Sequence, residues 1–375
     1  MNDTSSSTTN SSNDKYLYEF EGDIHPDVDI PHKSQILIIS KDQSYLTHGI
    51  HKFPAKFFPE LPRYLIRKYS KLHDVVLDPM CGSGTAILEA ILNTRKAIGI
   101  DIDPIANLVS KVKTTPIDEK ELLSCVNALD ELISTRISDG YRPTIPEFSY
   151  RDNWFRKFVL EELGIIFDSI QERRISSHVD IYDFFKVVFS SIIKDVSNAD
   201  PHCTRTVIRK KNIRNINPGE TISLFQETLK SSIDSIIDFT KVASNLGYLD
   251  CKIYSSSALE TGLESNSVDF TVTSPPYINA VDYPRTHQLE MYWLELIEEA
   301  PLSNMKRKYI GTETVYKEEY SNLHQLGVLS LDPILSKIYE VDPRRSFIAR
   351  RISPSVRGLA RSGSRLFSIF SPTIV

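Results

Sequence analysis

Residues 75–92 read VVLDPMCGSGTAILEAIL, and the class of fold follows from their pattern. A short apolar run is followed by a turn with two glycines and then by a longer apolar run at helical spacing, which predicts strand, turn and helix. Residues 96–101 (KAIGID) predict a second strand, and Asp103-Pro104 is typical of the start of a second helix. Strands and helices that alternate through short links predict an α/β fold with a parallel sheet and right-handed connections.

The middle of the chain interrupts this pattern. Apolar residues fall at helical spacing over residues 118–137, 154–194 and 222–246, and the aromatic residues of 155–189 belong to that helical core pattern. Strand-like runs return at 252–254 and 268–273, and further helices are expected at 286–299 and 332–351. We therefore divide the chain into a disordered tail (1–14), a first half of the sheet domain (15–117), a large α-rich insertion (118–249), a second half (250–343) and a basic C-terminal stretch (344–375).

Composition excludes several classes of protein. The chain has 375 residues, 41% hydrophobic and 25% charged, which is ordinary for a globular protein. Its apolar runs are too short to span a bilayer, and the Ser/Thr/Asn-rich start lacks the features of a secretory signal. Four scattered cysteines predict a reduced, cytoplasmic protein, and His202 with Cys203 are too isolated for a metal site. Because the net charge is -5, a nucleic-acid site has to be local.

The glycine turn and the strand after it are typical of a cofactor site. Glycines between a strand and a helix let the backbone approach a ligand closely. The turn lacks the Gly-Lys-Ser/Thr ending of a phosphate loop, and GSGTAI is not a dinucleotide fingerprint, so a plain tight turn is the alternative. Asp101, about twenty residues further on, suits the hydroxyls of a ribose. Its alternative role is a helix N-cap, which we assign to Asp103 before Pro104.

A third element is the run Thr273-Ser274-Pro275-Pro276-Tyr277, which ends a predicted strand. Ligands of open α/β sheets bind at such carboxyl ends. The two prolines stiffen the turn and remove two backbone donors, which leaves hydroxyl and carbonyl acceptors beside an aromatic ring. Such a wall suits a planar ring that carries an exocyclic amine. The alternative is a rigid loop without a ligand.

Taken together, residues 78–85 (DPMCGSGT) and 273–277 (TSPPY) closely resemble the S-adenosylmethionine-dependent amino-methyltransferases of DNA. The serine before Pro-Pro-Tyr resembles the motif of the N4-cytosine subgroup of these restriction-modification enzymes. Residues 48–61 (HGIHKFPAKFFPEL) are similar to the family segment that covers the methionine end of the cofactor. The resemblance spans roughly residues 45–114 and 250–345, and it implies a Rossmann-like class I methyltransferase sheet.

The resemblance also implies a reaction and its residues. A methyl group would pass in line from S-adenosyl-L-methionine to N4 of a cytosine flipped out of double-stranded DNA, which protects the site from a partner restriction endonuclease. No metal and no covalent enzyme intermediate are implied, and Cys81 is not a nucleophile. The catalytic candidates are Ser274, Pro275, Pro276 and Tyr277. The cofactor candidates are Phe53, Pro54, Lys56, Asp78, Pro79, Cys81, Gly82, Ser83, Gly84, Thr85, Asp101, Ser256 and Ser257.

Contacts to DNA are expected in the insertion. Residues 205–214 carry five positive charges and no acid, a run that suits phosphates, although a solvated surface is the alternative. The DNA-binding candidates are Arg205, Arg209, Lys210, Lys211 and Arg214.

The sequence departs from the family in two places. Tyr254-Ser255-Ser256-Ser257 stands where relatives carry an acid that contacts the adenosyl part. After Ser-Pro-Pro-Tyr the family sheet needs three more strands, and only residues 364–375 have strand-like composition. The acid-free stretch from Arg344 therefore indicates a truncated or frameshifted frame, or a basic phosphate-binding tail. An adenine-N6 or RNA amino-methyltransferase and an inactive nucleic-acid-binding relic remain alternative functions.

Overall fold

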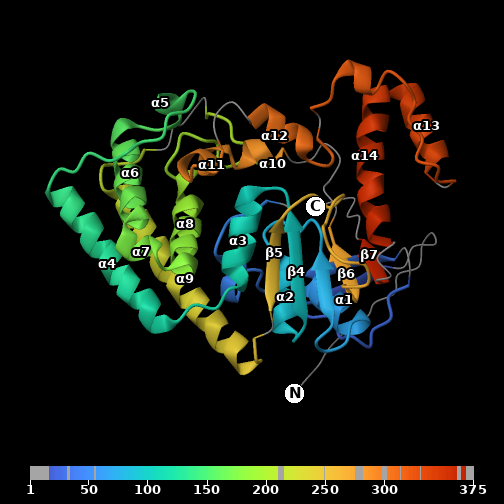
Figure 1. The fold of residues 1–375 in the computed structure, drawn as a ribbon, viewed down its shortest axis with the longest axis horizontal. Helices are drawn as coiled ribbons and strands as arrows, with labels where there is room; N and C mark the ends of the chain where they lie inside the picture. Colours follow the sequence, from blue (N-terminus) through green and yellow to red (C-terminus); the bar gives the residue numbers. More distant parts are fainter. Residues whose placement is uncertain are drawn as a thin grey trace.

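A five-stranded parallel sheet forms the centre of the molecule (Figure 1). The computed structural model describes residues 17–31, 34–54, 56–209, 215–248, 250–274, 282–297, 302–312, 314–329, 331–360 and 365–368. The strands lie in the order β5-β4-β3-β6-β7, so the chain winds outward from β3 first to one side and then to the other. Their bounds are β3 (Val75–Asp78), β4 (Lys96–Asp101), β5 (Cys251–Ser255), β6 (Phe270–Thr273) and β7 (Arg365–Ser368).

Helices α1 (Glu60–Tyr69), α2 (Thr85–Leu92) and α3 (Pro104–Thr114) pack against this sheet. The predicted strand, glycine turn and helix are β3, the turn and α2, and the predicted second unit is β4 and α3. The prediction that Asp103 caps the second helix is confirmed, because its carboxylate accepts hydrogen bonds from the backbone N–H groups of Ile105 and Ala106. Pro104 occupies the first helical position, where its missing N–H costs nothing.

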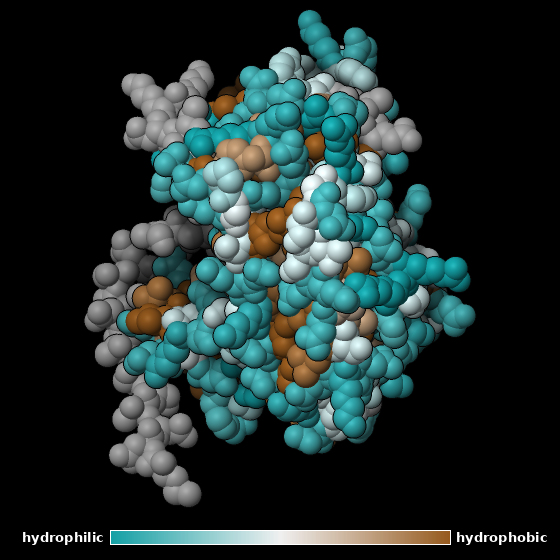
Figure 2. Space-filling view, turned by 90° about the vertical axis from the view of Figure 1, so that its left-hand side faces the viewer, coloured by the Kyte–Doolittle hydropathy of each residue, from teal (hydrophilic) through white to brown (hydrophobic). Residues whose placement is uncertain are grey.

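The stretch between α3 and β5 is helical, as predicted, and lies beside the sheet (Figure 1). Its hydrophobic core is continuous with that of the sheet, because fully buried Phe184, Phe189 and Phe225 belong to the same cluster as Val76 and Phe270. Figure 2 shows the outer face of the insertion as mostly hydrophilic, with a narrow apolar strip down its middle. Its helices are α4 (Glu119–Ser138), α5 (Arg151–Trp154), α6 (Lys157–Gln171), α7 (Arg173–Ser176), α8 (Val179–Ile193) and α9 (Glu220–Asn245).

Two helix predictions in the C-terminal part are wrong in extent. The helix expected at 286–299 is replaced by α10 (Tyr283–Thr286) and α11 (Gln288–Trp293), and Glu295 just beyond them has a positive φ of 54°. The helix expected at 332–351 is divided into α13 (Asp332–Val341) and α14 (Pro343–Ala360). Asp342 between them has extended backbone, since the ring of Pro343 disfavours a helical conformation in the residue before it.

The remaining elements lie around the sheet domain. Strands β1 (Leu17–Glu21) and β2 (Gln35–Ile39) form a small parallel pair of their own, with η1 (Leu46–Gly49), α12 (Leu302–Lys308) and η2 (Lys317–Glu319) elsewhere. Of the three strands expected after Ser-Pro-Pro-Tyr, β7 is present and pairs with β6. The proposed tail, residues 1–14, lies outside the described residues. No helix among the described residues is long and apolar enough to cross a bilayer.

We expect Phe189→Ala to destabilise the whole protein, because this ring is fully buried between Phe167 and Trp293. Loss of a buried phenylalanine costs about 3–5 kcal/mol. Urea unfolding followed by circular dichroism measures the change, with Tyr150→Ala, at a side chain that is 75% exposed, as the matched control. Because the core is continuous, a single shifted transition is expected. A separate early transition that leaves the sheet folded would contradict it.

Candidate cofactor and target-base site

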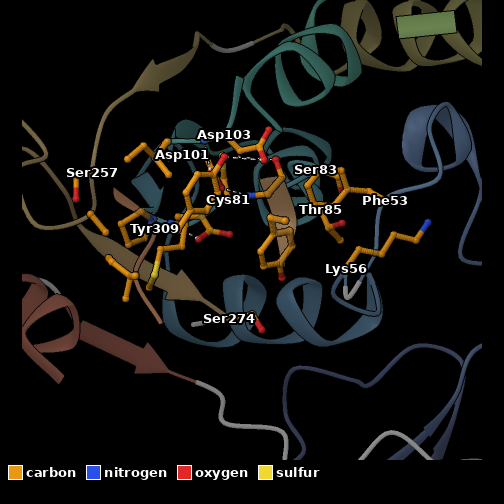
Figure 3. Close-up of a pocket in the computed structure, with 18 of the residues that line it drawn as sticks. Phe53, Lys56, Cys81, Ser83, Thr85, Asp101, Asp103, Ser257, Ser274 and Tyr309 are labelled. Carbon is orange, nitrogen blue, oxygen red and sulfur yellow. Dashed lines mark hydrogen bonds between the residues drawn. The ribbon is translucent and has the colours of Figure 1, made fainter. Parts of the chain in front are cut away.

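One cavity lies at the carboxyl ends of the central strands, where the strand order reverses between β3 and β6. Open α/β sheets bind ligands at this switch point because the loops after the two strands leave in opposite directions. Figure 3 shows labelled side chains from the glycine turn, from the ends of β4 and β6 and from residues 53–56 around this common space. The sequence-predicted residues that line it are Phe53, Pro54, Lys56, Asp78, Pro79, Cys81, Gly82, Ser83, Thr85, Asp101, Ser256, Ser257 and Ser274.

Gly84 is the one described cofactor candidate that does not line the cavity, and its role is in the backbone of the turn. Gly82 and Gly84 both have positive φ, 51° and 76°, a conformation that favours glycine. A Cβ on Gly84 would lie 2.8 Å from Oγ of Ser110 in α3. The same hydroxyl donates a hydrogen bond of 2.6 Å to the carbonyl of Gly82. The turn is therefore held directly against α3.

Asp78, which is buried, and Asp101, which is half-buried, place their carboxyls at the cavity. One carboxylate oxygen of Asp101 accepts from the backbone N–H of Gly82 at 2.8 Å, and the other accepts from that of Asp103 at 2.9 Å. Burial, followed by the nearby charge of Asp103, raises the pKa of Asp101 to about 6. Burial likewise raises the pKa of Asp78 to about 7. Each carboxylate is thus held in a place where positive charge would be favoured.

Tyr309 is a lining residue that the sequence did not suggest. Its hydroxyl donates a hydrogen bond of 2.9 Å to the second carboxylate oxygen of Asp103, the oxygen that does not cap α3. Burial raises the pKa of this phenol, which keeps it protonated as a donor. Tyr309 follows α12 in the chain and carries no local motif, so only the folded chain brings it to the cavity. Other lining residues outside the candidate list are Phe57, Met80, Ile102, Asp103, Ala258, Tyr283, Lys308 and Ile310.

Phe53, Pro54 and Lys56 form another side of the cavity. The ring of Phe53 stacks on His287 at 4.8 Å between centroids and lies 6.3 Å from the ring of Tyr283. The ammonium of Lys56 points away from the cavity in Figure 3 and donates to the carbonyls of Gln43 and His48, each at 3.4 Å. Lys56 therefore contributes its alkyl chain to the lining more than its charge.

The remaining candidates fall into three groups. Ser256 and Ser257 line the cavity, but the hydroxyl of Ser256 donates to the carbonyl of Glu260, and that of Ser257 accepts from the N–H of Leu259. Arg205 and Arg209 are described and lie outside the cavity lining. The candidates outside the described residues are Pro275, Pro276, Tyr277, Lys210, Lys211 and Arg214.

The sheet order, the glycine turn and the position of the cavity are those of a class I methyltransferase fold. Residues 7–109 match the N6_N4_Mtase family model, described as DNA methylase. The chain is thus related to the N6/N4 DNA methylases, a family that uses S-adenosylmethionine. No solved structure matches the chain.

Several relatives carry the name type II methyltransferase, and three of them match more than two thirds of this chain. M.MvaI of Kocuria varians is 26% identical and the match covers 72% of this chain and 62% of the relative. M.MjaII of Methanocaldococcus jannaschii is 22% identical over 76% of this chain and 69% of the relative. M.BsoBI of Geobacillus stearothermophilus is 24% identical over 76% of this chain and 59% of the relative. The chain thus spans about 60–70% of the length of these relatives.

The described residues fit the methyl donor of that family. The hydroxyls of Ser83 and Thr85 are buried and have no hydrogen-bond partner among the described residues, a state that is rare for buried polar groups unless a ligand or water is bound. They lie beside two carboxyls whose raised pKa values favour a cationic neighbour. The donor carries an ammonium, a sulfonium, a carboxylate and two ribose hydroxyls, and this set of groups could satisfy both features.

We expect Gly84→Ala to destabilise the glycine turn by more than the strain of an alanine at positive φ alone. The new Cβ would collide with Ser110, whereas a Cβ at Gly140, which also has a positive φ of 64°, meets no atom within 4 Å. Gly140→Ala should cost about 1 kcal/mol and leave cofactor affinity unchanged. Gly84→Ala should cost more and weaken S-adenosylmethionine binding at least tenfold in isothermal titration calorimetry. Equal effects of the two substitutions would refute the close approach.

We expect cofactor affinity to rise with pH between about 5.5 and 8, as Asp101 and Asp78 ionise and attract the cation. The pKa values of both carboxyls are higher in the folded chain than in the unfolded chain. The two groups therefore contribute less to the free energy of unfolding as pH rises from about 4 to 7. The stabilisation by S-adenosylmethionine in a thermal melt should therefore be larger at pH 8 than at pH 5.5. Asp101→Asn should bind about tenfold more weakly at pH 8 and show a flatter profile, and an unchanged profile would count against its role.

Proposed function

We propose that the chain is the S-adenosylmethionine-dependent methyltransferase of a type II restriction-modification system and that it methylates N4 of a cytosine flipped out of double-stranded DNA. The observation that carries the proposal is the position of Ser274. It follows β6 directly and lines the same cavity as the glycine turn and Asp101. A hydrogen-bond acceptor for the target amine and the candidate cofactor site thus share one cavity, as methyl transfer to a base requires.

The acceptors at Ser274 suit an exocyclic amine. The lone pair of cytosine N4 is delocalised into the ring, so the amine is a poor nucleophile. Hydrogen bonds from its N–H groups to the Ser274 hydroxyl and the Pro275 carbonyl favour the pyramidal form, whose lone pair is available. The bound cofactor supplies an electrophilic methyl group on its sulfonium. Pro276 and Tyr277 lie outside the described residues; in this proposal Pro276 would stiffen the turn and Tyr277 would stack on the flipped base.

The other candidates bind the cofactor. Asp101 accepts hydrogen bonds from the ribose hydroxyls. Ser83 and Thr85 form hydrogen bonds with the polar groups of the cofactor that lie near the glycine turn. Phe53, Pro54 and Lys56 cover the methionine end, and burial of the Lys56 ammonium lowers its pKa. Ser256 and Ser257 contact the adenosyl part, each with the second hydrogen-bonding capacity that a hydroxyl retains. Asp78, Pro79, Cys81, Gly82 and Gly84 shape the turn.

The names of the relatives support the biological role. Three matched proteins are called type II methyltransferases, which favours modification of a specific DNA site and protection from a partner endonuclease. Serine before Pro-Pro-Tyr favours cytosine N4, since aspartate is the commoner residue in the adenine relatives. DNA recognition is assigned to the insertion and its basic run, Arg205 to Arg214.

The test is a product analysis. The protein is incubated with unmodified duplex DNA and methyl-labelled S-adenosylmethionine, and the DNA is digested to nucleosides. Label in N4-methylcytosine is expected. Label found only in N6-methyladenine, or only when RNA replaces DNA, would refute the assignment of the base or of the nucleic acid, and absence of cofactor binding would support a relic.

We expect Ser274→Ala to slow methyl transfer by about 10²–10³-fold, the usual cost of removing one preorganised hydrogen-bonding group. Its affinity for S-adenosylmethionine should stay within about threefold of wild type, because the hydroxyl addresses the base. Ser255→Ala, at an exposed serine at the end of β5, is the matched control. A single-turnover assay separates the chemical step from binding. A Ser274→Ala rate equal to that of the control would exclude Ser274 from the reaction.

A further inference from the structure

Three segments far apart in the sequence meet beside the cavity. Lys52 precedes Phe53, which lines the cavity, and its ammonium forms a 2.7 Å ion pair with Asp195, just after α8. His51 and His287 are both buried, with ring centroids 6.2 Å apart. Residues 51–53, 194–209 and 285–287 thus converge at this place, which we call the rim.

The middle segment is fixed to the rim by hydrogen bonds of buried groups. Residues 198–209 fold back through an antiparallel bridge between Ala199 and Ile208. Thr206, which is 1% exposed, donates from its hydroxyl to the carbonyl of Thr286 at 2.7 Å and from its N–H to the carbonyl of Arg285. The position of this insertion segment relative to α10 is therefore defined by the fold.

The anchoring brings two exposed arginines close together. Arg205 precedes Thr206 and Arg285 precedes Thr286, so the Thr206 contacts join their backbones. Among the described residues, neither guanidinium forms an ion pair with a carboxylate. The nearby acid Asp282 pairs with Lys306 at 3.1 Å, and Asp195 pairs with Lys52. The Lys52 side chain is still 80% exposed, so the rim presents a local excess of positive charge on a chain of net charge -5.

We propose that the rim is a phosphate-binding surface: Arg205, Arg285 and Lys52 bind the backbone of the DNA strand that flanks the base entering the cavity. This inference rests on the proposed function and adds Arg285 and Lys52, which belong to no basic run in the sequence. Tyr283, two residues before Arg285, lines the cavity, so a phosphate held at Arg285 lies next to the entrance. A flipped nucleotide needs its flanking phosphates held, since extrusion rotates the backbone at that point.

Duplex DNA fits this rim better than a discrete anion does. The three cations come from separate segments and are exposed, as phosphate-contacting side chains are, whereas a site for a small anion would enclose its ligand. Phosphate contacts of this kind are independent of sequence, and each one contributes about 0.9 to the slope of log affinity against log salt concentration. The rim can therefore be tested without knowledge of the target sequence.

The experiment measures binding of full-length protein to a fluorescent duplex DNA of random sequence, by anisotropy, across a series of salt concentrations. The double variant Arg205→Ala/Arg285→Ala should lower the salt slope by nearly two and weaken binding about 10–100-fold at low salt. Arg205→Lys/Arg285→Lys should restore most of the slope. Lys71→Ala is the control, because this exposed lysine precedes β3 at the opposite edge of the sheet.

Cofactor affinity and thermal stability of the double variant should match wild type, which excludes misfolding. If the wild-type protein methylates DNA but the double variant keeps the wild-type salt slope, the phosphate-binding role of the rim is refuted and the proposed function stands. A wild-type protein that transfers no methyl group to DNA would overturn the proposed function, while the slopes still test the rim. Tighter, rim-dependent binding of a duplex RNA of the same length would overturn the assignment to DNA.

Discussion

The site depends on the half-buried carboxylate of Asp101, which joins the two halves of the first α/β unit. Its oxygens accept the N–H groups of Gly82 and Asp103, so the glycine turn after β3 is tied to the end of β4. Asp103 then caps α3 with one oxygen and binds Tyr309 with the other. A single chain of charge-assisted hydrogen bonds therefore fixes the turn, the start of α3 and a segment more than 200 residues away.

This arrangement is costly without a cationic ligand. Burial raises the pKa of both Asp78 and Asp101, and the nearby charge of Asp101 raises that of Asp78 further. The hydroxyls of Ser83 and Thr85 beside them also lack partners among the described residues. Such features conflict with stability and are typical of sites built for a ligand that removes the conflict. A sulfonium donor with an ammonium group has the required charge.

Local sequence patterns account for the central part of this picture. The glycine turn, the Asp103 cap and the helical insertion follow from short-range rules, because each depends on neighbouring residues alone. Tyr309 and Arg285 could not be found in that way, since the place of Tyr309 at the cavity and the contact of Arg285 with Thr206 result from packing between distant segments. The break at Asp342 is different: Pro343 was a local signal, and the apolar periodicity on both sides of it concealed the end of the helix.

The topology explains why an insertion at this point can serve the site. A parallel strand must begin at the amino edge of the sheet, and α3 already ends there, because the carbonyl of Thr114 accepts a hydrogen bond from Tyr248 and its hydroxyl contacts Cys251, the first residue of β5. The insertion instead travels first to the carboxyl edge, where α8 ends near α11, and then returns through α9 (Figure 1). The 26 residues of α9 span about 39 Å at ~1.5 Å per residue, enough for the whole return. Residues 194–209, which include Arg205, are consequently held beside the cavity by the same connection that completes the sheet.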